Sequence, residues 1–105
     1  RLFLALPALA TPALAQARPI RLVIPFTAGG SNDILGRILA DAMAQRLGVP
    51  FVVENRGGAG GILGNDIVAK APPDGQTLLL AGSGSFVISA LTHGRTPYDL
   101  SLIHI

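Results

Sequence analysis

The sequence has no cysteine and no tryptophan, only one tyrosine and two histidines, and charged residues at only 13% of its 105 positions. The absence of cysteine excludes disulfide bonds and thiolate metal sites. A formal net charge of +2, scattered along the chain, is too small for a nucleic-acid-binding surface. His93 and His104 are isolated, and we expect no metal site and no cofactor. Hydrophobic residues, by contrast, make up 50% of a chain that has room for about one small domain.

Residues 1–17, "RLFLALPALATPALAQA", differ in composition from the rest of the chain. A basic start, an apolar middle and small residues near the end are typical of a secretory signal peptide. The apolar run is interrupted by Pro7 and Pro12 and is too short to span a bilayer. The alternative is a buried or membrane-anchoring helix. We predict a signal peptide with a clipped start, and therefore export to the periplasm.

The last six residues, 100–105, form the apolar run "LSLIHI", which has no turn or helix cap. The run also reads like a translated transposon end. We expect these residues to be a non-native tail, so that residues 18–99 are the part to interpret.

Residues 18–99 alternate short apolar runs with segments of helical periodicity. Strands are predicted at 20–26, 51–54 and 77–81, and helices at 34–47 and 62–70, with a third from Phe86. Short strands joined by helices imply an α/β fold with a parallel sheet. The order is β-α-β-α-β-α.

Two glycine- and serine-containing turns follow the first and third predicted strands, at Gly29–Asp33 and Gly82–Ser85. Each opens a helix, where bare N–H groups and the positive end of the helix dipole favour an anion such as a carboxylate. The two turns flank a ligand crevice if the first strand lies between the other two. The alternative for each turn is ordinary helix capping, with Ser31 or Asn32 as the expected N-cap.

Two further polar features allow more than one interpretation. Asp33 fits the positive first turn of its helix, or it contacts a ligand hydroxyl or ammonium group. The glycine cluster Gly57–Gly64 lacks the G-x-G-x-x-G spacing of a dinucleotide site, because Leu63 occupies the position of the last glycine. Glu54, Asn55 and Arg56 are expected to connect this loop to its neighbours.

No catalytic motif is present: the sequence has neither G-x-S-x-G nor H-E-x-x-H. We expect a binding protein rather than an enzyme. Two alternatives remain, an exported α/β hydrolase with Ser83 or Ser85 as nucleophile, and a truncated product without function by itself.

Four motifs together make residues 18–99 resemble the substrate-binding receptors of tripartite tricarboxylate transporters, the Bug-type extracytoplasmic solute receptors. They are P-F-x-x-G-G-x-x-D from Pro25, V-E-N-R-x-G-A-G-G from Val53, A-P-P-D-G-x-T-L-L from Ala71, and Pro97–Asp99. The resemblance implies a type II periplasmic binding protein with two lobes, of which this chain supplies the N-terminal part of lobe one. It also implies a small carboxylate ligand and transporter membrane subunits as partners.

The ligand loops of the family map onto the two turns already identified. The residues expected to contact the ligand are Thr27, Ala28, Gly29, Gly30, Ser31, Asn32, Asp33, Gly82, Ser83, Gly84 and Ser85. Thr27–Ala28 departs from the proline-containing pairs frequent in the family, which affects ligand preference rather than fold. The second lobe is missing from this chain, which by itself could not close around a ligand.

Overall fold

The computed structural model describes residues 18–92 and 96–99. The expected signal peptide, the expected non-native tail and both histidines lie outside these residues. The elements are β1 (Ile20–Ile24), α1 (Ser31–Leu47), β2 (Phe51–Asn55), η1 (Ala59–Gly61), α2 (Ile62–Ala69), β3 (Thr77–Leu79), η2 (Gly84–Ile88) and α3 (Ser89–Thr92). In this part of the chain, no helix has the length and apolar character needed to cross a membrane.

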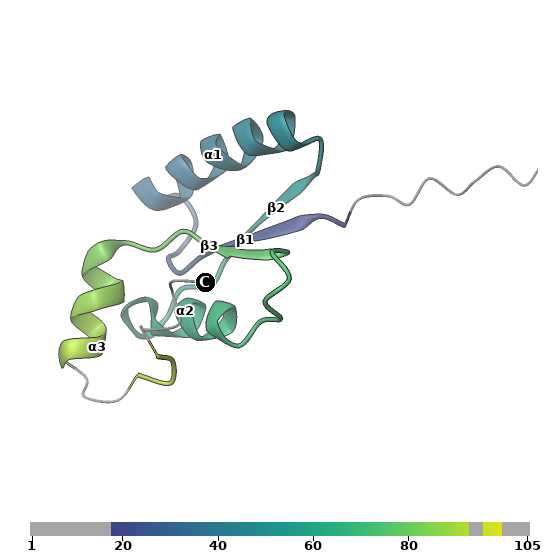
Figure 1. Ribbon diagram of the computed structural model, residues 1–105. Coiled ribbons are helices and arrows are strands. Elements are labelled where there is room, and N and C mark those ends of the chain that lie inside the picture. The colour runs from purple at the N-terminus through teal and green to yellow at the C-terminus, as the bar shows by residue number, and fades with distance from the viewer. Residues whose placement is uncertain (1–17, 93–95, 100–105) are drawn as a thin grey trace, which may run out of the picture.

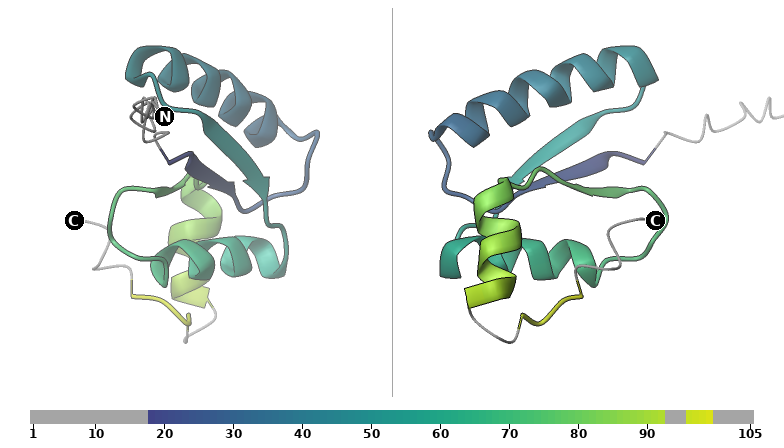
Figure 2. Two further views of the ribbon diagram at one scale, coloured as in Figure 1. Left: turned by 90° about the vertical axis from the view of Figure 1, so that its right-hand side faces the viewer. Right: turned by 60° about the vertical axis from the view of Figure 1, so that its left-hand side comes forward.

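The three strands form one parallel sheet in the order β2-β1-β3. Leu22 is in register with Val53 on one side and with Leu78 on the other. α1 covers one face of the sheet and α2 the other, as Figures 1 and 2 show from three directions. The predicted α/β class with a parallel sheet is confirmed, and β1 is central, as the crevice requires.

The buried centre of the molecule is β1, where Leu22, Val23 and Ile24 are at most 3% exposed. β1 ends at Ile24, two residues earlier than predicted, and β3 ends at Leu79 instead of Ala81. The last hydrogen bond of the ladder between β1 and β3 is donated by the Leu80 N–H to the Val23 carbonyl, at 3.0 Å. The next N–H of β1 would come from Pro25, which has none, so the ladder stops there.

α1 packs on the sheet through small residues rather than through its large apolar side chains. Gly36 and Ala40 are buried together with Asp33, whereas Ile34, Leu35 and Ile38 are each more than half exposed. The helical periodicity predicted the helix correctly, but the residues of α1 that are buried are small or polar, not its large apolar ones. The physical reason is the close approach of α1 to β1, which leaves room only for small side chains.

Both helices approach the end of β1 through a glycine. A Cβ atom on Gly36 would collide with the side chains of Ile24 and Leu80. A Cβ atom on Gly64 of α2 would lie 2.8 Å from the Cα atom of Pro25 and 2.9 Å from the carbonyl oxygen of Arg56. These glycines therefore set the distance of the two helix layers from the sheet.

We predict that Gly64→Ala lowers the free energy of unfolding of the complete receptor by about 1–3 kcal/mol, because the new methyl group meets backbone atoms that cannot rotate away. Gly36→Ala should cost less, since the ends of the Ile24 and Leu80 side chains can move. Denaturant unfolding of both variants measures the difference. A Gly64→Ala receptor as stable as the wild type would contradict the close packing described here.

Candidate functional site

The loops that follow the three strands lie at one edge of the sheet, the carboxyl edge (Figure 1). Within the parallel sheet, β1 is the central strand. The loop that follows β1 therefore lies between the loops that follow β2 and β3. The two turns predicted from the sequence therefore lie at the same edge. Parallel α/β sheets bind their ligands at this edge, beside the central strands.

The first turn, Thr27–Gly30, is exposed and leads into α1. Gly29 has a φ of +91°, a conformation that favours glycine. α1 begins at Ser31, and its N-cap is Gly30, without a side-chain cap, so the prediction of Ser31 or Asn32 as N-cap is wrong. Among the residues that the structure describes, none accepts a hydrogen bond from the backbone N–H of Ser31 or Asn32. Two donors are thus free at the positive end of a 17-residue helix.

Asp33 lies behind this turn, and its side chain is 7% exposed. Its Oδ2 atom accepts the Gly29 N–H at 2.9 Å. Its Oδ1 atom accepts the Arg37 Nε–H at 3.1 Å and the Asn55 amide at 3.0 Å. The Gly29 N–H, followed by the Asn55 amide and the Arg37 guanidinium, holds the pKa of the Asp33 carboxyl below its ordinary value. The carboxylate thus reaches back from the third helical position and fixes the loop before the helix, while the first N–H groups of the helix stay uncapped.

The second turn, Gly82–Ser85, is closed by its own hydrogen bonds. The Gly82 carbonyl accepts the Ser85 hydroxyl at 3.1 Å and the Phe86 N–H at 3.0 Å. Ser83 and Gly84 are exposed, and their N–H groups have no acceptor within the described ranges. A Cβ atom on Gly82 would lie 3.7 Å from the Phe26 ring, so this turn adjoins the first.

Tyr98, from the Pro97–Asp99 motif, fixes the segment after the second turn. Its ring stacks on Phe86 with centroids 5.9 Å apart and an interplanar angle of 8°. Its hydroxyl accepts the amide of Asn65, a side chain of α2 that is 1% exposed, at 3.1 Å. Sequence reasoning used this motif only for the family resemblance and missed its contact with the turn.

The glycine loop after β2 contacts both turns, which sequence reasoning also missed. A Cβ atom on Gly57 would lie 3.2 Å from the Thr27 nitrogen, and one on Gly61 would lie 3.3 Å from the Ser85 Oγ atom. The glycine cluster was itself the available signal, because glycines without a nucleotide motif indicate close backbone approach.

The predicted connecting role of Glu54, Asn55 and Arg56 is confirmed. Glu54 accepts two hydrogen bonds from Arg21 of β1, at 2.8 and 2.7 Å, and lies 3.7 Å from the Arg56 guanidinium. The Arg21 hydrogen bond is the main reason that the pKa of the Glu54 carboxyl is lowered. Asn55 contacts the first turn through Phe26 and Asp33.

The side chains of the hydrolase alternative make no arrangement that indicates catalysis. The Ser85 hydroxyl donates to the Gly82 carbonyl, and Ser83 is exposed. The histidines of this chain, His93 and His104, lie outside the described residues. Within residues 18–92 and 96–99, no group of three or more acidic or histidine side chains could hold a metal ion.

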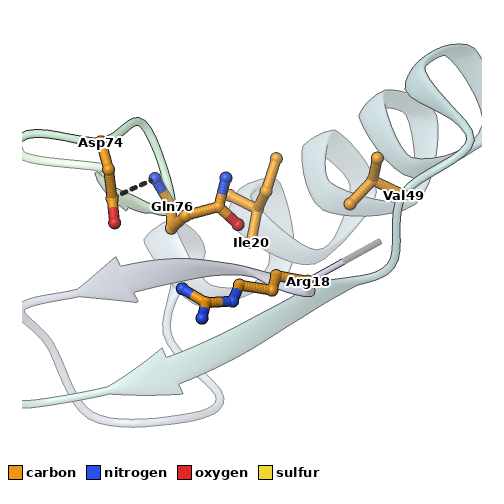
Figure 3. Close-up of a pocket in the computed structure, with 5 residues that line it drawn as sticks. All are labelled: Arg18, Ile20, Val49, Asp74 and Gln76. Atoms are coloured by element: carbon orange, nitrogen blue, oxygen red, sulfur yellow. Dashed lines mark hydrogen bonds between the residues drawn. The ribbon is translucent and has the colours of Figure 1, made fainter. Parts of the chain in front are cut away.

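A hollow of about 430 Å³ lies at the opposite, amino edge of the sheet. Figure 3 shows its lining residues, which precede or begin the strands: Arg18, Ile20, Val49, Asp74 and Gln76. The Asp74 carboxylate accepts a hydrogen bond from the Gln76 N–H at 2.9 Å. We place the candidate site at the carboxyl edge instead, because free N–H donors and a helix start are found there.

The comparison with protein families agrees with the sequence motifs. The family described as "Tripartite tricarboxylate transporter family receptor" matches residues 35–104, about two thirds of the chain. The chain belongs to this family. The match includes most of the segment expected to be a non-native tail.

The chain is also similar in sequence and in structure to individual proteins with the names of Bug proteins or periplasmic binding proteins. Protein BugT of Bordetella pertussis is 46% identical over 87 residues, which are 80% of this chain and 27% of BugT. The solved periplasmic binding protein BugD is 52% identical, with a TM-score of 0.58 over 59% of this chain and 21% of that protein. MatC from Rhodopseudomonas palustris, solved with bound malate, is 36% identical, with a TM-score of 0.73 over 78% of this chain and 28% of that protein. The chain thus spans about a quarter of the length of these relatives.

The lowered pKa of Asp33 predicts a contribution to acid sensitivity. Its stabilising effect is present above the ordinary carboxyl pKa of about 4 and is lost as the pH falls through the lower folded value. We expect Asp33→Asn to weaken the dependence of unfolding free energy on pH below about 4, measured by denaturant titration of the complete receptor. The Glu54 carboxyl, whose pKa is also lowered, contributes a similar dependence of stability on pH, and this contribution should remain in Asp33→Asn.

Asp41→Asn, which removes a carboxylate from an exposed position of the same helix without touching the Asp33 contacts, is the matched control. An Asp33→Asn receptor with the wild-type pH dependence would contradict the role given to the Asp33 contacts.

Proposed function

We propose that this chain forms part of the first lobe of a periplasmic receptor and that the two turns at the carboxyl edge bind a carboxylate group of a small ligand. The observation that carries the proposal is the pair of free backbone N–H groups at Ser31 and Asn32. Amide donors at a helix start are a recurrent way of binding an anion. The exposed N–H groups of Ser83 and Gly84 add a second set at the same edge.

The charges around the first turn are compatible with an anion. The Asp33 carboxylate is the nearest negative group, and each of its oxygens already accepts at least one hydrogen bond. Arg37 offsets its charge, while the dipole of α1 contributes roughly half a positive charge at Ser31. We therefore propose that Asp33 supports the turn. The N–H and hydroxyl groups in front of it contact the ligand directly.

The family and its solved members support a carboxylate as the ligand class. MatC holds malate, a dicarboxylate, and BugD is a periplasmic binding protein. For this receptor we propose a small carboxylate, a periplasmic location, and delivery of the ligand to the membrane subunits of a tripartite tricarboxylate-type transporter. The part of the receptor beyond this chain would supply the second wall of the site and the choice among carboxylates.

Two substitutions at Ser31 separate the backbone donor from the hydroxyl. Ser31→Ala removes only the hydroxyl. Ser31→Pro also removes the N–H, at the first helical position, where proline is favoured, and after Gly30, whose extended backbone (φ −78°, ψ 171°) tolerates a following proline. We expect Ser31→Pro to bind the carboxylate more weakly than Ser31→Ala, by about tenfold or more, since a hydrogen bond to a charged group contributes about 1.5–3 kcal/mol.

Calorimetric titration of the complete receptor with malate and other small di- and tricarboxylates measures these affinities. Gln45→Ala, on the exposed C-terminal part of α1, serves as a control that should bind like the wild type. Thermal unfolding should show that Ser31→Pro remains folded. A folded Ser31→Pro receptor with the affinity of Ser31→Ala would exclude the start of α1 as the anion site.

A further inference from the structure

We propose that Asn55 is a positioning residue for the ligand site: it holds the first turn in the conformation that presents its free N–H groups. The inference rests on the proposed function, which places the carboxylate at this turn. Asn55 is the last residue of β2 and is half-buried. No ligand contact is assigned to it; it acts through the turn that it binds.

The Asn55 amide joins three separate segments. Its Nδ2 atom donates to the Phe26 carbonyl at 3.2 Å and to the Asp33 Oδ1 atom at 3.0 Å. Its Oδ1 atom accepts from the Arg37 guanidinium at 3.3 Å. One side chain therefore connects the end of β2 with the start of the turn and with the first two turns of α1.

The turn needs such an anchor because it has few others. Thr27–Gly30 is exposed and contains two glycines, so it would sample many conformations if it were released. The Asn55 bond to the Phe26 carbonyl fixes the peptide plane that also carries the Thr27 N–H. Its bond to Asp33 holds the carboxylate that binds the Gly29 N–H. Ordering the turn before the ligand arrives lowers the entropic cost of binding.

The end of β2 is a rigid base for this anchor. The Arg56 N–H donates to the Ile24 carbonyl at 2.9 Å, which continues the pairing of β2 with the buried β1. Asn55 itself is in register with Ile24. Its side chain therefore starts from a fixed backbone position, whereas the turn that it holds is exposed.

The chemistry of the site requires an amide rather than a carboxylate at position 55. Nδ2 donates to two oxygens, one of which belongs to the ionised Asp33. Asn55→Asp keeps the shape of the side chain but places a negative oxygen against the Phe26 carbonyl and against Asp33. The like charges repel, and both donated bonds are lost. Asn55→Ala removes the same bonds without the repulsion.

The test uses the complete receptor and malate as the probe, or another carboxylate that the wild type binds. We expect Asn55→Asp and Asn55→Ala each to weaken binding by about tenfold, the effect of losing roughly one net hydrogen bond. Hydrogen exchange of the N–H groups in residues 27–33, measured without ligand, should be faster in both variants. Affinities are compared at a temperature where every variant is folded.

Glu54→Gln is the matched control. Glu54 precedes Asn55 on β2 and binds Arg21, away from the turn, so its loss should lower the midpoint of thermal unfolding without changing the affinity. Wild-type affinity in both Asn55 variants, or an affinity loss as large in Glu54→Gln, would overturn the positioning role. If the wild type binds no carboxylate, the proposed function fails; unchanged exchange in residues 27–33 would then overturn the positioning role independently.

Discussion

The end of β1, at Ile24 and Pro25, is the constraint on which the rest of the architecture depends. Pro25 has no N–H group, so the ladder with β3 stops there and the chain must leave the sheet. The two helix layers approach this point from opposite faces through Gly36 and Gly64. The first turn therefore starts from two fully buried residues, and its direction is set by the core beneath it.

Above this point the two turns are stabilised by different physical means. The first is held by charge and amide chemistry, in which Asp33 collects hydrogen bonds from the loop, from α1 and from β2. The second is held by its own Gly82 carbonyl and by the stacked rings of Phe86 and Tyr98. In both, these contacts support the turn and leave backbone N–H donors free in front. That division suits a site that must stay ordered before its ligand arrives.

Much of the candidate site could be predicted because parallel strands bring their following loops to one edge. The positions of Gly29–Asp33 and Gly82–Ser85 follow from that rule together with the strand pattern. The roles within the turns could not be read in the same way. Ser31 and Asn32 looked like caps by composition, but Gly30 is the N-cap, and Asp33 accepts the Gly29 N–H in the loop before the helix. The glycine cluster did signal the close approach of Gly57 and Gly61, but the partners of Asn55 and the stacking of Tyr98 on Phe86 depend on segments distant in sequence, which no local pattern reveals.

The sequence by itself determined the α/β class, the order of the elements and the edge at which the loops gather, because these depend on periodicity, on glycine and proline, and on the geometry common to parallel sheets. Only the tertiary structure decided which face of α1 meets the sheet. Periodicity marks Ile34 and Ile38 as an apolar stripe, yet Gly36 and Ala40 are buried, since the distance between layers is fixed by the smallest residues at the contact. The tertiary structure also decided the environment of Asp33, because the number of hydrogen-bond donors around a carboxylate depends on segments that meet only after folding.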